Sequence, residues 1–476
     1  MMPVSNVDSS RTSALWRYGL FAIDSELLVE RQIKINGESL TVGGHPILLD
    51  EFDRILVVGA GKAGTGMAKG VMKSLKRLNG SKQIEGWVNV PENCVEELSS
   101  IKLSSIKLHG GRPAGLNEPT EQGRAGAKKI LELVQSAGPR DVVICLVSGG
   151  GSALAPFPVS GVSLEAKLQV TRFLSKQGAS INELNSVRTA ISQIKGGRLI
   201  QGFAGHSFHS LIISDVLGNP LEVIASGMTV PRQPAELESG ITSALETLQK
   251  FDPDREHVDP AIYLAIENQS GQPLPDSTPD NIFNCIVGEN ATIVRAVEQM
   301  ASQLGYEVFA HSASQSEADV EILADNLWNA MGQQLAKGPL ARPFCFISGG
   351  EPTVNVAGGN GKGGRNQHLA SLMLDKIQRA GMPSGVGFEF ISIGTDGEDG
   401  PTDAAGAVVN RQVLENLEKS QLDLPAFIEN RDSYHLFEAV GGLLKTGPTH
   451  TNVCDLRIFL VWDQASESTG SSFSPF

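Results

Sequence analysis

Two short glycine turns, one in each half of the chain, constrain the fold most. Each follows an apolar run typical of a buried strand, at 142–147 and at 344–347. A strand that stops at glycines leaves bare backbone N–H groups at its carboxyl end, where open α/β sheets bind ligands. Such groups suit an anion such as phosphate. The predicted anion-binding residues of these turns are Ser148, Gly149, Gly150, Gly151 and Ser152 in the first, and Gly349, Gly350 and Glu351 in the second.

Strand-like runs alternate with helix-like runs along most of the sequence. An apolar run at 55–58 ends in a glycine turn that opens a helix to about residue 78, and helices are expected at 163–177 and 186–200. This alternation predicts a Rossmann-like, doubly wound parallel sheet with helices on both faces. We expect that α/β domain to span residues 10–260.

A second α/β domain is expected over residues 275–465, followed by a flexible tail at 466–476. The stretch 251–281 holds five prolines among acidic and polar residues, which indicates a domain boundary inside it. The apolar run at 283–287 is read as the first strand of the second domain. We also expect the two domains to close on their ligand, because closure would exclude water from the reaction.

Charge and cysteine content exclude several classes of protein. The net charge is −14, so nucleic acid and anionic membranes are not expected partners. The five cysteines include no C-x-x-C pair, which favours buried reduced thiols. The sequence contains no run of 18 apolar residues, so no membrane span is expected. We expect a cytoplasmic protein, with a mitochondrial location as the alternative, and a possible homodimer.

The turn after the first strand carries a cation. Gly59-x-Gly61-x-x-Gly64 matches the dinucleotide fingerprint, but the acidic residue that should bind ribose is missing, since positions 79 and 80 are Asn and Gly. Lys62 would add a full positive charge to an anion site at the start of a helix. A phosphate or carboxylate contact and a surface lysine both remain open for Lys62.

A second group of polar residues is expected on one helix face. Asn185, Arg188, Ser192 and Lys195 recur at helical spacing before a Gly-Gly stop. Two of the four are cations, which suggests a helix that faces an anion. A solvated stripe is the alternative.

The second half supplies further candidates. Gly363, Gly364, Arg365 and Asn366 belong to a glycine-rich, cationic loop of the type that covers nucleotide phosphates. Downstream, Asp396 and Asp399 lie in an acidic cluster that suits Mg²⁺, which prefers oxygen ligands.

Taken in order, these blocks resemble the class II glycerate kinases, the glycerate 2-kinases of the MOFRL family. The matching blocks are 58–63, 147–153, Asn185-x-x-Arg188 with 195–197, 214–215 with 224–227, 349–353 with 363–367, and 395–403. The resemblance implies transfer of a phosphoryl group from ATP to D-glycerate, usually at the 2-hydroxyl, with Mg²⁺. It further implies that Lys62 and Arg365 are essential cations and that Asp215, at a predicted strand end, is catalytic.

Three positions depart from the family pattern, and two alternative functions stay open. The stretch 109–118 lacks the family's His-Pro-x-Pro-Asp turn, His368 replaces a Glu, and Met228 replaces a Pro. An NAD-dependent hydroxypyruvate reductase is the alternative that the dinucleotide fingerprint motivates. A non-catalytic phosphosugar-binding regulator would use the same glycine turns without turnover.

Overall fold

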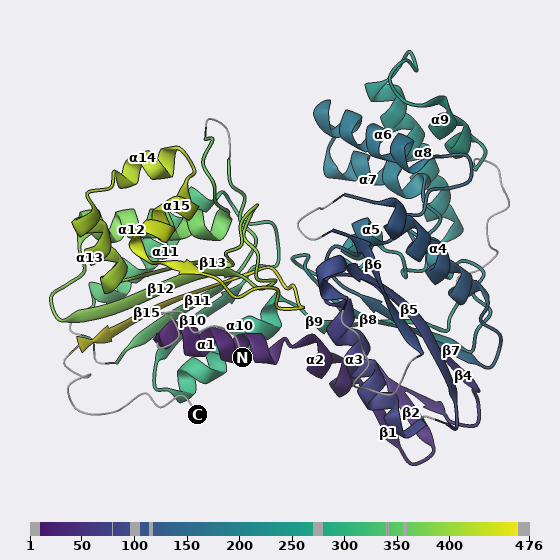
Figure 1. Cartoon of the computed structure of the whole chain (residues 1–476), viewed down its shortest axis with the longest axis horizontal. Helices are drawn as coiled ribbons and strands as arrows, with labels where there is room; N and C mark the ends of the chain where they lie inside the picture. The colour runs from purple at the N-terminus through teal and green to yellow at the C-terminus, as the bar shows by residue number, and fades with distance from the viewer. Residues whose placement is uncertain are drawn as a thin grey trace. The chain divides into compact units, whose positions relative to one another are not determined.

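The computed structural model describes residues 10–78, 80–95, 105–113, 118–269, 279–338, 340, 342–355 and 359–464, and divides them between two compact units (Figure 1). The parallel-sheet unit consists of Ser25–Ser214 and Asn219–Val287. The mixed-sheet unit consists of Met1–Asp24, Asp215–Gly218 and Gly288–Phe476. Each is described by itself. No helix in these ranges is both long and apolar enough to cross a membrane.

The parallel-sheet unit is built on a six-stranded sheet in the order β6-β5-β4-β7-β8-β9. Its strands are β4 (Arg54–Ala60), β5 (Gln83–Pro91), β6 (Ile106–Arg112), β7 (Asp141–Val147), β8 (Ser207–Ile213) and β9 (Ile282–Gly288). The pairs β5–β6, β4–β5, β4–β7 and β7–β8 are parallel. All seven residues of β8 are buried, as expected for a strand covered on both faces. The predicted Rossmann-like α/β architecture is confirmed.

Helices and a small hairpin sheet complete this unit. The helices are α2 (Ser25–Gln32), α3 (Gly64–Ser74), α4 (Glu121–Gln135), α5 (Gly151–Leu154), α6 (Leu164–Lys176), α7 (Ile181–Ala190), α8 (Pro234–Phe251) and α9 (Pro260–Glu267). The strands β1 (Ile33–Asn36), β2 (Ser39–Val42) and β3 (His45–Leu48) form an antiparallel sheet. Helices α6 to α9 gather in one layer (Figure 1), around a core of residues such as Leu174, Val187 and Ile262.

The strand expected to begin the second domain belongs to the first sheet instead. β9 lies beside β8 at the sheet edge, and the Phe208 N–H donates to the Asn281 carbonyl at 2.9 Å. The stretch 251–281 therefore does not carry the chain directly into the next sheet. The chain forms α9 and returns to the sheet that it left, a pairing that local composition could not reveal.

The mixed-sheet unit contains six strands in the order β10-β11-β15-β12-β13-β14. They are β10 (Glu307–Ser312), β11 (Phe344–Gly350), β12 (Val386–Gly394), β13 (Gly406–Asn410), β14 (Leu443–Leu444) and β15 (Asp455–Asp463). Only β10–β11 is a parallel pair; the others are antiparallel. Its helices are α1 (Arg11–Ala22), α10 (Asn290–Gln303), α11 (Val320–Leu335), α12 (Arg365–Ala380), α13 (Arg411–Ser420), α14 (Leu424–Glu429) and α15 (Ser433–Val440).

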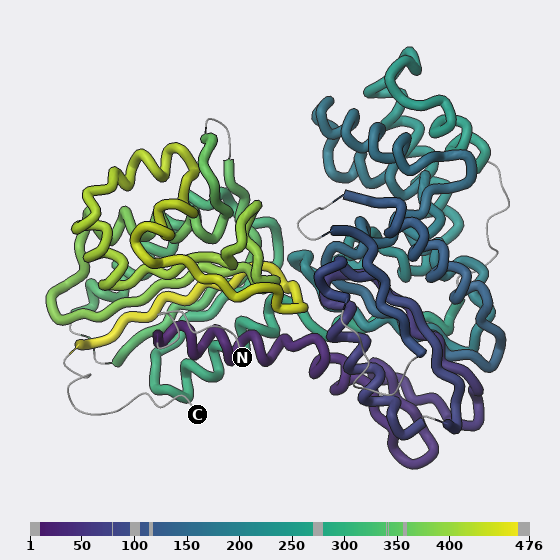
Figure 2. The backbone as a smooth tube through the Cα atoms, viewed as in Figure 1, coloured from purple at the N-terminus to yellow at the C-terminus, as the bar shows by residue number. Residues whose placement is uncertain are grey.

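The first helix, α1, belongs to the mixed-sheet unit, although most of that unit comes from the C-terminal half of the chain. α1 lies alongside α10 (Figure 2), and the backbone N–H and hydroxyl of Thr12 both donate to buried Glu389 on β12, at 2.7 and 2.5 Å. The predicted boundaries 10–260 and 275–465 therefore differ from the two units at α1, at residues 215–218 and at the strand near 282–287. The predicted tail at 466–476 lies outside the described residues.

Candidate active site

The glycine turns after β4 and β7 lie side by side at the carboxyl ends of these two central strands of the parallel sheet. Ala60 pairs with Val147, so Gly61 and Ser148 follow the two strands side by side. The Ser148 hydroxyl accepts from the Ala63 N–H at 3.0 Å, and the Lys62 N–H donates to the Gly149 carbonyl at 2.9 Å. A Cβ on Gly61 would lie 2.0 Å from the Ser148 hydroxyl. Gly61 and Ser148 thus join the two turns, whatever further contact they make with a ligand.

Two cationic side chains, Arg112 and Lys62, lie beside Gly150 in the turn after β7. Gly150 has a φ of +77°, and a Cβ built on it would lie 3.3 Å from Arg112 Nη2 and 3.5 Å from Lys62 Cγ. Arg112 ends β6 and is buried. The sequence analysis missed Arg112, although it stands in the segment that departs from the family pattern. Its signal was its place after a strand-like run, at the sheet edge that also carries the glycine turns.

A second cluster of cations surrounds Ser152. Arg188 Nη2 donates to the Ser152 hydroxyl at 3.2 Å, Lys195 Nζ also donates to it, and the Ser226 hydroxyl lies 3.0 Å away. The convergence of Arg188 and Lys195 was predicted for the wrong reason. Helix α7 ends at Ala190, so Lys195 does not share a helix face with Arg188.

The helix ends early because the next residues form a turn. The Ser192 hydroxyl accepts from the N–H groups of Ile194 and Lys195, at 3.3 and 3.2 Å, and competes with helical hydrogen bonding. Gly196 and Gly197 then take positive φ values of +61° and +79°. The chain folds back, and Lys195 reaches Ser152 from a loop.

The mixed-sheet unit holds a pocket of about 790 Å³ beside the first residue of α12. Arg365 Nε and Nη2 donate to the two carboxylate oxygens of Asp455 at 2.6 and 3.0 Å, while Nη1 lies 2.9 Å from Glu351. The lining residues are Asp215, Val216, Leu217, Ser316, Glu351, Pro352, Thr353, Val354, Gly364, Arg365 and Gly400. Four predicted site residues from distant parts of the sequence, Asp215, Glu351, Gly364 and Arg365, therefore line one pocket.

The charges of this pocket shift the pKa values of its residues. Burial alone would lower the pKa of Arg365, but the charges of Asp455 and Glu351 outweigh it and raise that pKa. Burial raises the pKa of Glu351, and the Asp455 charge adds to this shift against the opposing effect of Arg365. Arg365 is thus permanently charged, and two carboxylates share its guanidinium.

Asp215 lies directly after β8 at the edge of this pocket. Its side chain accepts from Asn452 Nδ2 at 3.4 Å, and its carbonyl accepts from the Cys454 thiol at 3.0 Å. These contacts fix the turn that carries the carboxylate. They leave Asp215 at the pocket wall, where it can contact a hydroxyl group.

Asp399 anchors the start of α12. Its Oδ1 accepts from the backbone and side-chain N–H groups of Asn366 at 3.1 and 3.4 Å, and its Oδ2 accepts from the corresponding groups of Gln367 at 2.9 and 3.0 Å. Burial raises the pKa of Asp399 to about 6, against the effect of these hydrogen bonds. Four donors occupy the oxygen sites that a metal would need. Asp399 therefore fits a helix anchor better than a metal ligand.

The remaining glycines of this unit permit close packing. A Cβ on Gly349 would lie 1.9 Å from the Asn290 side chain, and one on Gly350 would lie 2.1 Å from the carboxylate of Glu317. Cβ atoms on Gly363 and Gly364 would meet Ser433 and Asp399 at 2.2 and 2.3 Å. These contacts are structural, and the predicted phosphate contacts of the same glycines stay a prediction.

The ion pair between Arg457 and Glu317, next to the glycine turn after β11, was also not predicted from the sequence. Fully buried Arg457 donates to both carboxylate oxygens of Glu317, at 2.9 and 2.7 Å. Among the described residues, no group of three or more His, Cys, Asp or Glu side chains could hold a metal. The Mg²⁺ role expected of Asp396 and Asp399 stays a prediction.

Two family models match the chain. The model described as domain of unknown function DUF4147 matches residues 11–265, and the MOFRL family model matches residues 344–455. The glycerate kinase of Danio rerio is 31% identical over 95% of this chain and 97% of its own length. The chain belongs to the glycerate kinase family. The glycerate 2-kinase of Pyrococcus horikoshii is 32% identical, over 92% of this chain and 94% of that protein.

Solved structures agree with this family assignment. The crystal structure of glycerate kinase from Thermotoga maritima has a TM-score of 0.76 and 31% identity, and covers 94% of this chain and 98% of its own. A Pyrococcus horikoshii protein has a TM-score of 0.74 and 29% identity, with 97% and 99% coverage. The resemblance seen in the sequence is thereby confirmed over nearly the whole chain.

Proposed function

We propose that the protein transfers the γ-phosphoryl group of ATP to D-glycerate, at the 2-hydroxyl, to give 2-phosphoglycerate. The main support is the family membership over almost the full length, together with relatives named glycerate kinase and glycerate 2-kinase. Phosphoryl transfer depends mainly on positioning and charge stabilisation, which need cations held in fixed geometry. Both units supply such cations.

Arg365 is the best placed cation of the mixed-sheet unit. Asp455 and Glu351 fix its guanidinium at the wall of the pocket, and Asp399 anchors the helix turn that carries it. Its role is to neutralise charge on the moving phosphoryl group. Asp215, at the wall of the same pocket, would orient the acceptor hydroxyl or accept its proton.

Lys62 serves the anionic groups of the reactants in the parallel-sheet unit. It lies with Arg112 beside a glycine turn in which Gly150 has a positive φ that favours glycine. Mg²⁺ would accompany ATP and reduce its charge, and its protein ligands stay open, since both carboxylate oxygens of Asp399 already accept hydrogen bonds. The sequence alternatives, a reductase and a non-catalytic binder, have no support from the named relatives.

The product of the reaction tests the function directly. Protein incubated with ATP, MgCl₂ and D-glycerate should form 2-phosphoglycerate, which ³¹P NMR distinguishes from the 3-phosphate. Absence of any new phosphate ester would refute the kinase, and a 3-phosphate would refute only the site of transfer. Consumption of NADH with hydroxypyruvate would support the reductase instead.

A matched pair of variants on α12 tests the role of Arg365. Arg365→Met should lower kcat by about 10³-fold or more, because cations at such positions supply rate factors of about 10³–10⁵. Arg379→Met, on the same helix but 68% exposed, should retain normal kcat. Normal activity of Arg365→Met would exclude Arg365 from the chemical step.

A further inference from the structure

Four cationic side chains of the parallel-sheet unit, two of them buried and two half-buried, have no carboxylate partner among the described residues. They are Lys167 on α6, Arg188 on α7, and Lys195 and Arg198 in the segment that follows α7. In the described part of the chain, their recorded hydrogen bonds go only to neutral groups. None of the four forms an ion pair with a residue that the structure describes. Buried charges are normally paired, so this group calls for an explanation.

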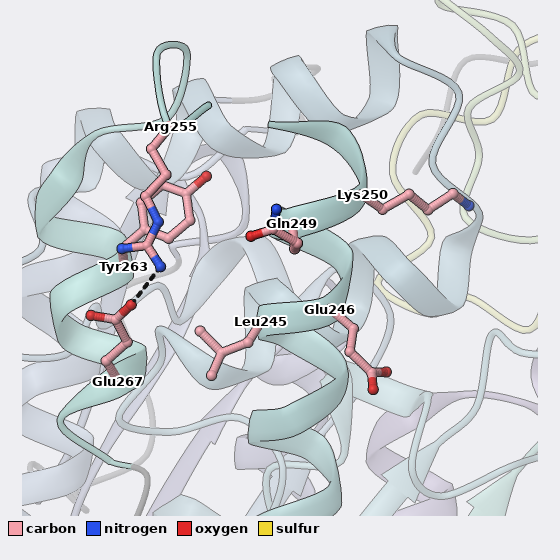
Figure 3. A pocket seen from close by; sticks show the side chains of 7 residues that line it. All are labelled: Leu245, Glu246, Gln249, Lys250, Arg255, Tyr263 and Glu267. Carbon is pink, nitrogen blue, oxygen red and sulfur yellow. Dashed lines mark hydrogen bonds and ion pairs between the residues drawn. The ribbon is translucent and has the colours of Figure 1, made fainter. Parts of the chain in front are cut away.

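A neighbouring pocket of the same unit shows the usual arrangement. The cavity between α8 and α9, of about 510 Å³, also carries two cations (Figure 3). There Arg255 lies 2.8 Å from Glu267, and Lys250 lies 2.6 Å from Glu183. Each cation has its own carboxylate, and both are largely exposed. The buried cluster differs in having cations alone.

The cluster is layered around Ser152. Ser152 and Arg188 are partly exposed, so an anion from solvent can contact both the hydroxyl and the guanidinium. Lys195 lies behind Ser152 and is 2% exposed. Lys167 is 3% exposed, and its Nζ has no hydrogen-bond partner. Arg198 is tied to the carbonyls of Ala190 and Ser192 and positions the turn that carries Lys195.

Burial shifts both lysines toward their neutral forms. The pKa of Lys167 falls to about 7 because of burial first, and then because of the charges of Arg188 and Arg198. The pKa of Lys195 falls well below its usual value through burial, Lys167 and Arg188. Without a ligand, the two lysines therefore tend to lose their protons. An anion that binds beside them would favour their charged forms, so anion binding would be accompanied by proton uptake.

We propose that Ser152, Arg188, Lys195 and Lys167 form a receptor for a dianionic phosphate group, the phosphate oxygens contacting the Ser152 hydroxyl and the Arg188 guanidinium. One carboxylate would compensate a single charge and leave the lysines unpaired. A phosphate carries about two charges and accepts bonds from several donors at once. If the proposed function holds, the phosphorylated hydroxy acid is one source of this group, and inorganic phosphate is the other.

Calorimetry with inorganic phosphate tests the receptor. Phosphate should bind near pH 7.5, and titrations in two buffers of different ionisation enthalpy should show proton uptake. Lys167→Met should weaken binding at least tenfold and reduce the uptake. Lys176→Met, at the exposed end of the same helix, should change neither. Unchanged affinity in a folded Lys167→Met protein, or acetate binding as tightly as phosphate, would overturn the proposal.

The source of the phosphate is a separate comparison. Binding of 2-phospho-D-glycerate at least tenfold tighter than inorganic phosphate, and weakened by Lys167→Met, would assign the receptor to the phosphorylated acid. Equal affinities would assign it to the free ion. If the protein formed no phosphate ester but still bound phosphate through Lys167, the proposed function would fail while the receptor stood. If the protein phosphorylated D-glycerate but Lys167→Met left phosphate binding unchanged, the proposed function would stand and the receptor would fail.

Discussion

Replacing Lys167 by Met should stabilise the parallel-sheet unit while it weakens the phosphate receptor. In the unfolded chain the lysine has a pKa near 10.5, whereas in the folded protein burial lowers that pKa to about 7. Between these values the unfolded chain binds a proton that the folded chain does not. Stability therefore falls as pH falls from about 10.5 to about 7. Methionine has a similar length and carries no charge to bury.

The size of the effect follows from the two pKa values. Near pH 7.5 the lysine costs roughly 4 kcal/mol of unfolding free energy, and near pH 9.5 only roughly 1 kcal/mol, because each pKa unit corresponds to about 1.36 kcal/mol. The stabilisation by Lys167→Met should shrink by roughly 2–3 kcal/mol over that range. The Lys167→Met substitution would thus increase the stability of the protein and weaken its binding of phosphate.

Hydrogen exchange can measure this locally. Peptides from α6 and α7 should exchange more slowly in Lys167→Met than in the wild type at pH 7.5, with a smaller difference at pH 9.5. The exposed Lys176→Met variant corrects for the chemical pH dependence of exchange. A stabilisation that does not change with pH, or a loss of stability, would show that Lys167 stays charged in the folded protein. The receptor argument would then lose its electrostatic basis.

Three further predictions concern other parts of the chain. Gly150→Ala should cost about 1–2 kcal/mol in urea unfolding, because it adds crowding against Arg112 to an unfavourable φ; Gly161→Ala, with φ +85° and open space around it, should show the backbone cost alone. Glu389→Gln should speed hydrogen exchange in α1 by weakening its bonds to Thr12, by about 1–3 kcal/mol. Native protein treated with iodoacetamide at pH 8 should react first at Cys285, since the other four cysteines are buried, and mass spectrometry would identify the labelled thiol.

The parts of the site that the sequence predicted are those fixed by neighbouring strands. Gly61 and Ser148 were each predicted in a glycine turn at the carboxyl end of a strand, and the structure adds that the two strands are neighbours. Asp215 could be read as a strand-end carboxylate for the same reason. In each case a local pattern and a general rule of sheet geometry were sufficient.

The parts that the sequence did not predict depend on contacts between distant segments. Asp455 meets Arg365 across 90 positions, and no local pattern marks it as a partner. β9 could be assigned to its sheet only through its pairing beside β8. The end of α7 depends on the Ser192 turn, which helical periodicity does not reveal. Lys167 lies in the helix expected at 163–177, and nothing in its local sequence distinguishes it from a surface lysine.

The two units divide charge in opposite ways, and this division bears on how they handle an anionic substrate. In the described part of the parallel-sheet unit, the buried and half-buried basic side chains near Ser152 have no carboxylate partner, so an anion can enter without displacing an ion pair. In the mixed-sheet unit, Asp455 and Glu351 already surround Arg365, so an entering phosphate must compete with them. Burial favours the neutral form of Glu351, which weakens that competition. The proposed anion binding by the first unit and the proposed transient charge neutralisation by Arg365 in the second are therefore distinct tasks, as differential stabilisation of a transition state requires.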